Sequence, residues 1–381
     1  MTRPRAPGPP LSATGDPSGS QRGAAGPIRI SLHAPGFPTT TEPDPPFPPT
    51  SILNAPQDPV ANLTLVQAIN LALVQEMERD DRVIILGEDV GPNGGVFRVT
   101  EGLHKRFGGH RVVDTPLAES GIIGTSIGLA MAGLRPVPEI QFDGFLGPAY
   151  DQLCSHAARM RTRTRSAFTV PLTVRVPVGG GIHAPELHSD SPEAIYAHQP
   201  GLKVVMPASP YDAKGLLISA IRDPDPVLFF EPKRIYRAFR EEVPEDEYTI
   251  PIGKARVVAE GEEMTMVSWG ASVVQCMQAI EKSGRSIELI DLRTIWPLDT
   301  ETILESVRKT GRVVIVHEAP KSGGWGAEIA TRITEHCFLH LEAPPQRVAG
   351  FDTIMPYYKL EMEYMPDAAR IAKAIDETAA Y

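Results

Sequence analysis

The sequence predicts an α/β protein of two domains, each with a parallel β-sheet covered by helices. Three observations support this. Short β-branched runs alternate with helical patterns along most of the chain, the alternation stops once over residues 232–252, and it then resumes. Such alternation is typical of βαβ units, in which helices cover both faces of a parallel sheet. We therefore expect domains at residues 61–235 and 253–381, joined by a linker at 236–252.

The first folded element is predicted to be an amphipathic helix over residues 65–79. Thr64 and Gln67 have the spacing of a capping box, and apolar residues then recur at helical intervals. A continuous, mostly β-branched run follows at residues 83–86, which is typical of a strand buried on both faces. This run ends at Gly87, so Glu88 is expected directly after the first strand of the sheet.

The other elements of the two domains are predicted from the same patterns. The first domain is expected to contain strands at 111–114, 137–142, 172–176, 203–207 and 226–230, and helices at 121–133, 149–159 and 212–221. The second domain is expected to contain strands at 264–268, 286–291 and 313–316, and helices at 271–282, 300–310 and 326–336. The segment between the domains is charged, contains Pro244 and Pro251 and lacks periodicity, which favours a linker.

Residues 1–60 differ in composition from the rest of the chain. They hold 15 of the 38 prolines and no net charge, whereas the remaining residues carry the entire net charge of −10. A segment with few aromatic and no patterned aliphatic residues cannot bury enough surface to offset its ordering entropy. We therefore expect a disordered leader, with a dispensable tail and a segment wrapped on a partner both open as interpretations.

Composition also excludes several classes of protein. An acidic chain without a basic run is unlike a nucleic-acid-binding protein, and no apolar run approaches the length that spans a bilayer. Three cysteines far apart in the sequence indicate free thiols in a reducing compartment. Since no targeting signal is visible, we expect a cytoplasmic protein, or one of the mitochondrial matrix if the source is eukaryotic.

Polar residues that follow predicted strands are the candidates for a functional site, because ligands of open α/β sheets bind at the carboxyl ends of strands. Glu119 follows a strand and precedes a helix of very small residues. Burial at such a junction raises the pKa of a carboxyl and keeps its proton available. The alternative is a carboxylate that pairs with the helix dipole. Glu88 and the segment 141–145 follow other strands of the same domain.

A long, glycine-rich polar loop holds two histidines, His183 and His188. Loops of this kind are more typical of active sites than of core turns. No third ligand lies at a familiar metal spacing, so general acid–base chemistry or stabilisation of an oxyanion is favoured. A surface histidine without such a role is the alternative.

The chain resembles the β subunits of the thiamine-diphosphate-dependent decarboxylating component of 2-oxo acid dehydrogenase complexes. The resemblance covers about residues 62–376 and is carried by motifs in one order. These motifs are Leu86-Gly-Glu-Asp-Val, Gly95-Val-Phe-Arg-Val-Thr-Glu-Gly-Leu, Asp114-Thr-Pro-Leu-Ala-Glu-Ser-Gly-Ile, His188-Ser-Asp-Ser-Pro-Glu, Pro200-Gly-Leu-Lys-Val-Val and Asp291-Leu-Arg-Thr-Ile-Trp-Pro-Leu-Asp. Three others look like the branched-chain type: Phe230-Glu-Pro-Lys-Arg-Ile-Tyr-Arg-Ala, His317-Glu-Ala-Pro and Leu341-Glu-Ala-Pro.

The resemblance implies a pyrimidine-binding domain followed by a transketolase C-terminal-type domain. Glu119 matches the carboxyl that hydrogen-bonds the aminopyrimidine ring of the cofactor, and His188 matches a histidine that assists acyl transfer to the lipoyl arm. Phe145 matches an aromatic residue that packs on the same ring, where branched-chain relatives often have tyrosine. Glu88, Leu117 and Gln141 match other positions beside the pocket.

The resemblance also implies partners and ions. The Gly-Asp-Gly and Asn-Asn strings of the thiamine diphosphate motif do not occur in the sequence, so an α subunit should hold Mg²⁺ and the diphosphate in an α2β2 heterotetramer. Some relatives bind structural potassium through carbonyl and carboxylate oxygens, which suit a hard cation. The alternative at this place is a solvated Asp-Pro-Asp turn. The matching positions are Leu172, Thr173, Ala220, Asp223 and Asp225.

The motifs thus predict a branched-chain 2-oxo acid dehydrogenase β subunit that decarboxylates 3-methyl-2-oxobutanoate and its homologues. It would then acylate a lipoyl domain and bind the acyltransferase core of the complex. The alternatives are a pyruvate or acetoin dehydrogenase β subunit and, in a different class, a non-catalytic assembly protein on the same fold.

Overall fold

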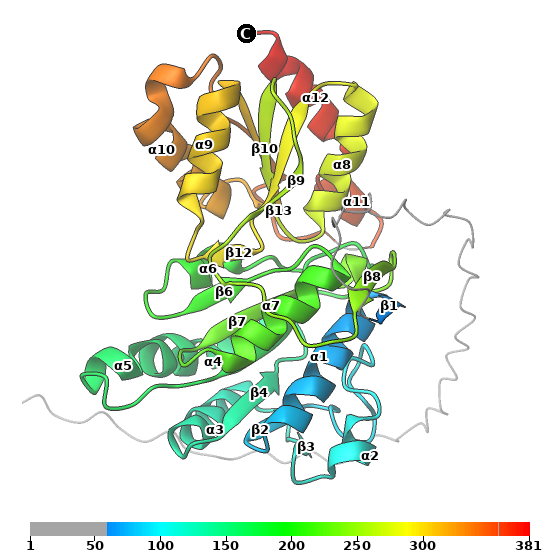
Figure 1. The fold of residues 1–381 in the computed structure, drawn as a ribbon, viewed down its shortest axis with the longest axis vertical. Helices are drawn as coiled ribbons and strands as arrows, with labels where there is room; N and C mark the ends of the chain where they lie inside the picture. Colours follow the sequence, from blue (N-terminus) through cyan, green and yellow to red (C-terminus); the bar gives the residue numbers. More distant parts are fainter. Residues whose placement is uncertain (1–58, 357) are drawn as a thin grey trace, which may run out of the picture. The chain divides into compact units, whose positions relative to one another are not determined.

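The computed structural model describes residues 59–356 and 358–381. The predicted leader lies outside these residues except at its last two positions. The described residues belong to one compact unit, so the predicted domain boundaries at 235 and 253 stay a prediction. Within this unit the described residues form a seven-stranded, a five-stranded and a two-stranded sheet (Figure 1).

The seven-stranded sheet has the order β12-β6-β7-β5-β4-β2-β3 and is parallel except for β12 at its edge. Its strands are β2 (Val83–Gly87), β3 (Val112–Asp114), β4 (Arg135–Glu139), β5 (Thr173–Val178), β6 (Lys203–Val205), β7 (Val227–Pro232) and β12 (Thr294–Trp296). Its helices are α1 (Leu65–Arg79), α2 (Leu103–Phe107), α3 (Glu119–Met131), α4 (Leu146–Asp151), α5 (Met160–Arg163), α6 (Glu193–Ala197) and α7 (Pro210–Arg222). The predicted capping box of Thr64 and Gln67 is present at the start of α1.

The five-stranded sheet has the order β14-β13-β10-β11-β9, in which only β9 runs antiparallel to its neighbour. Figure 1 shows α9 and α10 on one side of it and α8 and α12 on the other. Its strands are β9 (Arg256–Ala259), β10 (Met264–Ser268), β11 (Ile287–Asp291), β13 (Val313–Pro320) and β14 (Gln346–Gly350). Its helices are α8 (Ser272–Ser283), α9 (Thr300–Thr310), α10 (Trp325–Cys337), α11 (Glu361–Tyr364) and α12 (Ala368–Ala379).

The predicted α/β class and order of elements are confirmed, and the differences have physical reasons. The predicted linker holds β8 (Glu241–Pro244), which pairs antiparallel with β1 (Val60–Leu63), the first strand of the described residues. These charged residues form a strand only because they pair with a strand far away in the sequence. The helix expected at 149–159 is a chain of short α, π and 3-10 turns.

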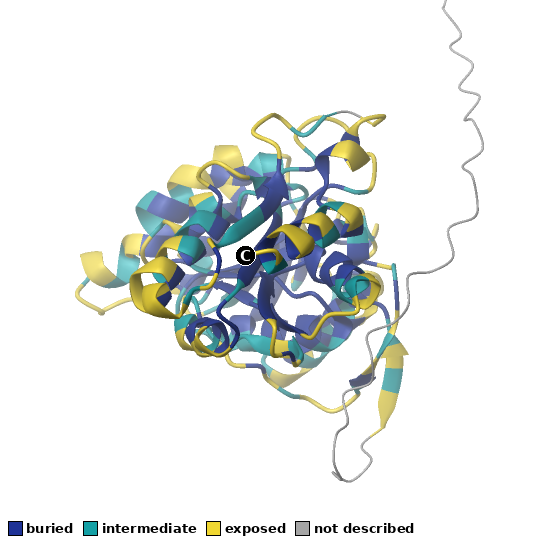
Figure 2. Cartoon of the chain, turned by 90° about the horizontal axis from the view of Figure 1, so that it is seen from above, coloured by how far each residue is buried: buried dark blue, intermediate teal, exposed yellow. Residues whose placement is uncertain are grey.

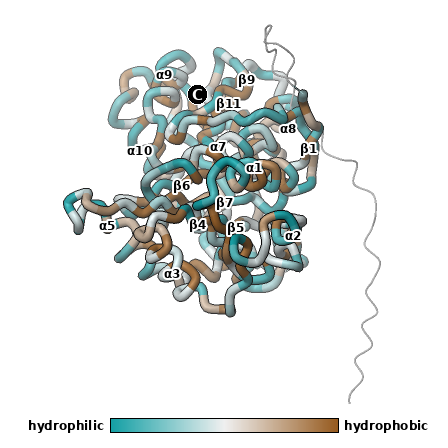
Figure 3. The backbone as a smooth tube through the Cα atoms, turned by 60° about the horizontal axis from the view of Figure 1, so that its bottom comes forward, coloured by the Kyte–Doolittle hydropathy of each residue, from teal (hydrophilic) through white to brown (hydrophobic). Residues whose placement is uncertain are grey.

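The core is continuous across the two large sheets. One cluster of buried residues includes Ile123 on α3, Val176 on β5, Val267 on β10 and Leu292 after β11. Figure 2 shows the central strands buried and the outer helices partly exposed, and Figure 3 shows hydrophobic stretches in the middle of the chain near β4 and β5. None of the helices among residues 59–356 and 358–381 is long and apolar enough to cross a membrane.

A buried ionic cluster joins three neighbouring strands of the seven-stranded sheet. The Arg175 guanidinium on β5 donates to Glu231 on β7 at 2.6 and 2.9 Å and to Glu139 on β4 at 2.7 Å. The Tyr236 hydroxyl donates to Glu231 Oε2 at 2.6 Å. All four side chains are almost fully buried, so each charge depends on its partners.

We expect Arg175→Met to lower the free energy of unfolding by about 3–5 kcal/mol, because it leaves two buried carboxylates without their cation. Arg285→Met is the matched control, since the pair of Arg285 and Glu263 lies at the surface at 3.4 Å, and its loss should cost no more than about 1 kcal/mol. Denaturant titration of both variants measures the difference. Equal losses would contradict the assigned role of the cluster.

Another buried carboxyl lies where the two large sheets meet. Glu193 at the start of α6 accepts a hydrogen bond from Trp269 Nε1 at 3.2 Å, and its Oε2 has no partner. Burial raises the pKa of Glu193 from 4.5 to about 8. Between these pH values the folded chain keeps a proton that the unfolded chain has released, so stability falls as the pH rises from 4.5 to about 8.

Glu193→Gln should remove this loss because glutamine does not ionise. At about pH 9 the variant should be more stable than the wild-type chain by on the order of 2–4 kcal/mol, and at about pH 5 the two should be similar. Free energies of unfolding at both pH values test this, with the exposed Glu377→Gln on α12 as control. A difference that does not change with pH would refute the raised pKa.

Candidate functional site

Four neighbouring strands of the seven-stranded sheet end at the predicted site. Adjacent in the order β5-β4-β2-β3, they lead at their carboxyl ends into the loop of His188, the segment 141–145, Glu88 and Glu119. The chain thus brings residues that are up to 100 positions apart to one edge of the sheet. This arrangement is the one expected for a ligand site in an open parallel sheet.

Glu88 and Glu119 are both buried, at 7% and 6% exposure. Glu119 is the first residue of α3, so its position suits both the buried-carboxyl and the helix-dipole interpretation. Burial raises the pKa of Glu88, and the nearby carboxylates of Glu119, Asp89 and Glu139 raise it further. The two predicted carboxyls are therefore close enough to interact.

The site retains polar atoms that the described residues leave without partners. Glu88 Oε1 and Thr115 Oγ1 are buried and have no hydrogen-bond partner. Thr115 N donates to Gly87 O at 2.9 Å, which keeps these groups on adjacent strand ends. Buried unpaired oxygens are costly, so a ligand with polar nitrogen atoms, such as an aminopyrimidine, fits this place.

Two phenylalanines pack against the ring of His188. The ring of Phe142 lies 4.1 Å from it between centroids, and the ring of Phe145 lies 5.2 Å away in an edge-on arrangement. Gln141 is half-buried two residues after β4, whereas Leu117 is 78% exposed. The structure thus brings Phe145 and His188 together, and Leu117 presents its side chain to the outside of this chain.

A buried ion pair holds the backbone of His188. Lys233 Nζ donates to Asp143 Oδ2 and to His188 O, both at 2.6 Å, and the two charged side chains are buried. Gly144 N donates to Leu187 O at 3.2 Å. The sequence patterns did not predict a role for Asp143 or Lys233, although Asp143 lies in the segment 141–145 and Lys233 in the motif that starts at Phe230. The only signal was that Asp143 directly follows one predicted strand and that Lys233 lies three residues after another.

Several oxygens at the five predicted potassium positions already have partners. Both carboxylate oxygens of Asp223 accept from Lys203 Nζ at 2.6 and 2.7 Å, and Asp225 Oδ1 accepts from Arg161 Nε at 2.8 Å. Leu172 O accepts from Val227 N at 2.9 Å. Among residues 59–356 and 358–381 no cluster of three His, Cys, Asp or Glu side chains could hold a metal. The potassium site stays a prediction.

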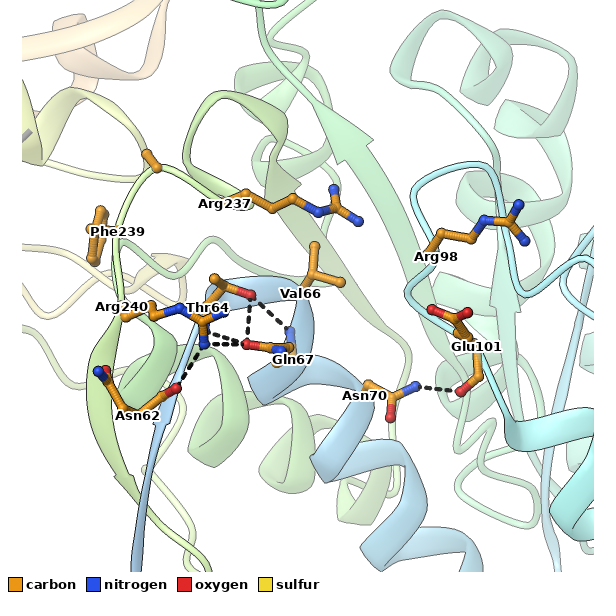
Figure 4. Close-up of a pocket in the computed structure, with 11 residues that line it drawn as sticks. Asn62, Thr64, Val66, Gln67, Asn70, Arg98, Glu101, Arg237, Phe239 and Arg240 are labelled. Atoms are coloured by element: carbon orange, nitrogen blue, oxygen red, sulfur yellow. Dashed lines mark hydrogen bonds between the residues drawn. The ribbon is translucent and has the colours of Figure 1, made fainter. Parts of the chain in front are cut away.

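A separate hollow of about 850 Å³ lies beside the start of α1 (Figure 4). Arg98, Arg237 and Arg240 line it, and their guanidinium groups donate to neutral oxygens, as Arg237 does to Phe97 O at 2.6 Å. None of the predicted site residues lines this hollow, so cavity size alone does not locate the site.

Residues 61–238 match the family described as transketolase, pyrimidine binding domain, and residues 253–371 match transketolase, C-terminal domain. The pyruvate dehydrogenase E1 component subunit beta of Acholeplasma laidlawii is 53% identical over 323 residues, which cover 84% of this chain and 99% of that protein. The protein of the same name from Staphylococcus aureus is 53% identical over 322 residues, with the same coverage.

A solved structure described as split gene transketolase, inactive beta4 tetramer, has a similar fold. Its TM-score is 0.68 at 20% identity, and the match covers 84% of this chain and 99% of that chain. At this identity the likeness concerns the fold alone. The much higher identity to the subunits above extends over almost their whole length. The chain therefore belongs to the family of the β subunits of the lipoamide-dependent decarboxylating component, E1, of 2-oxo acid dehydrogenases.

Proposed function

We propose that this chain is the β subunit of a pyruvate dehydrogenase, acting with an α subunit in an α2β2 heterotetramer. The observation that carries the proposal is the meeting of Glu88, Glu119, Phe145 and His188 at the ends of four adjacent strands. The relatives named as pyruvate dehydrogenase subunits support pyruvate as the substrate. The two carboxyls suit work on a cofactor, and the histidine suits proton transfer during acyl transfer.

Thiamine diphosphate, when bound, supplies a nucleophilic carbon and an electron sink for the loss of carbon dioxide. The carboxyl of Glu119 would hydrogen-bond its aminopyrimidine ring and hold a proton there. Glu88 Oε1 would accept a second hydrogen bond, which relieves an otherwise unpaired buried oxygen. Phe145 would pack on the ring, and Gln141 and Leu117 would line the pocket.

His188 would assist transfer of the acyl group to the lipoyl arm. The Phe142 and Phe145 rings restrict its imidazole, and Lys233 fixes its backbone. Held groups of this kind need little reorganisation when the substrate arrives. The paired phenylalanines would also exclude water from one side of the imidazole.

The other half of the cofactor site belongs to a partner in this proposal. The chain lacks the Gly-Asp-Gly and Asn-Asn strings, so an α subunit would hold Mg²⁺ and the diphosphate. The exposed Leu117 would then lie against that subunit. We further propose that the heterotetramer binds the acyltransferase core of a cytoplasmic complex, with potassium at Asp223 and Asp225 as an addition.

The branched-chain preference is the second candidate, and its supporting motifs have structural roles in this chain. Phe230 is buried, Glu231 pairs with Arg175 and Lys233 pairs with Asp143. Such residues organise the sheet and do not by themselves select a side chain of the substrate. Phe145, where branched-chain relatives often have tyrosine, also gives that preference no support.

The reconstituted α2β2 enzyme should prefer pyruvate to 3-methyl-2-oxobutanoate by about 10–200-fold in kcat/KM, because a pocket shaped for a methyl group excludes the larger side chain. Steady-state assays with both acids, and with 2-oxobutanoate as a control of intermediate size, measure the ratio. A preference for the branched acid would reverse the substrate assignment while leaving the subunit assignment intact.

Glu119→Gln in the reconstituted enzyme should reduce decarboxylation by about 10²–10⁴-fold, because the amide cannot hold or release the proton. Circular dichroism and calorimetric binding of thiamine diphosphate establish that the variant folds and loads. Glu281→Gln on α8 is the control, an exposed carboxylate in the other sheet's layer. Near-normal decarboxylation by Glu119→Gln would refute the role of Glu119 and favour a non-catalytic role for this chain's site.

A further inference from the structure

The loop that carries His188 starts with three glycines, and their backbone contacts residues of the five-stranded sheet and its helices. We call residues 179–190 the His188 loop; its ends meet where Gly179 N donates to Asp190 O at 2.9 Å. Gly179 and Gly181 have φ values of +82° and +90°, which favour glycine. A Cβ on Gly179 would lie 2.8 Å from Glu318 Oε1, so a side chain there would displace the Glu318 carboxylate.

Two carboxylates from distant parts of the chain accept hydrogen bonds from this turn. Glu318 on β13 accepts from Gly180 N, and from Ser191 Oγ at 3.3 Å. Glu361, the first residue of α11, accepts from Gly181 N at 2.5 Å and is 2% exposed. The backbone of the loop is thus tied to groups 138 and 180 residues away.

The second oxygen of Glu361 faces His183, which has a strained backbone. His183 has a φ of 56°, a left-handed conformation that costs a non-glycine residue on the order of 1–3 kcal/mol unless neighbours hold it. His183 Nδ1 lies 2.7 Å from Glu361 Oε2, and the two groups form an ion pair when the imidazole is protonated. One buried carboxylate therefore holds both the glycine turn and the strained residue that follows it.

The far end of the loop is held in the same way by the seven-stranded sheet. Leu187 also has a left-handed φ, of 62°, and its carbonyl accepts from Gly144 N. Lys233 Nζ holds the carbonyl of His188 itself. Both ends of the His188 loop are therefore held in place. Glu361 holds the first half of the loop and is not one of the predicted site residues.

We propose that Glu361 is a positioning residue: it orders the first half of the His188 loop and so sets where the His188 imidazole meets the lipoyl arm. The inference rests on the proposed function of His188. It assigns a role in acyl transfer to a residue of the C-terminal region that lies outside the predicted catalytic set. Glu361 itself touches neither substrate nor cofactor in this proposal.

The test uses Glu361→Ala and Glu361→Gln in the reconstituted α2β2 enzyme. Glutamine keeps an acceptor for Gly181 N and loses the charge that faces His183, whereas alanine loses both. We expect Glu361→Ala to slow reductive acylation of a free lipoyl domain by about 10–100-fold, while decarboxylation measured with ferricyanide as acceptor changes by less than about threefold. Glu361→Gln should lie between the wild-type enzyme and Glu361→Ala. Amide hydrogen exchange should speed up over residues 180–188 in Glu361→Ala.

Glu363→Gln on the same helix is the matched control, because Glu363 is exposed and should leave both rates and the exchange pattern unchanged. Parallel loss of both reactions with a lowered Tm would mean a general folding defect and overturn the positioning role. Unchanged exchange over residues 180–188 would overturn it as well. His188→Ala separates the two claims: if it leaves acylation intact, the proposed role of His188 fails, while the exchange data still report whether Glu361 orders the loop.

Discussion

The buried ionic cluster around Arg175 is the constraint on which the rest of the site depends. Buried ion pairs contribute little net stability, because desolvation offsets most of their attraction. Their larger effect here is on strand register. Arg175 lies directly opposite Glu139 in the β4–β5 pairing, and a slip by one residue would turn its side chain to the other face of the sheet. The slip would leave buried charges unpaired, so the cluster disfavours every register but one.

The register of these strands determines the geometry of the candidate site, because each of the three strands that meet in the cluster leads into that site. β4 leads to Phe145, β5 to the His188 loop and β7 to Lys233. Glu139 also adds to the field that raises the pKa of Glu88. In the cluster both carboxylates pair with one cation, whereas Glu88 keeps an unpartnered oxygen. This contrast is expected where a scaffold stabilises a site whose polar groups are kept for a ligand.

Local patterns predicted most of the fold because the central strands are continuous apolar runs and the long helices are amphipathic. Local patterns did not predict strands that depend on long-range pairing. β8 forms only by pairing with β1, and β12 pairs with β6 at the edge of the first sheet. The helix α12 was missed although Ile371 and Ile375 have helical spacing and Asp367 caps its start. These signals are local, so the sequence itself encodes α12.

In the candidate site, too, local patterns predicted some residues and missed those that act through long-range contacts. Glu88, Glu119 and His188 follow strands, and the rule of carboxyl ends locates such residues from sequence alone. Partners such as Asp143 and Glu361 contact the His188 loop across 47 and 180 positions, and no local pattern encodes those distances. Motifs such as Phe230-Glu-Pro-Lys were assigned to substrate choice, yet their charged members lie in buried ion pairs. Residues of a family motif can thus stabilise the fold without lining the substrate pocket.

The second sheet then has a role although none of the predicted catalytic residues lies on it. Its core is continuous with that of the first sheet, through Val267 and Leu292 packed in one cluster with Val176. A shared core gives the carboxylates of Glu318 and Glu361 a fixed position relative to the glycine turn that they bind. Two left-handed residues, His183 and Leu187, can persist in one loop only when their surroundings over-determine them. The continuous core is what allows contacts from both sheets to meet that requirement at once.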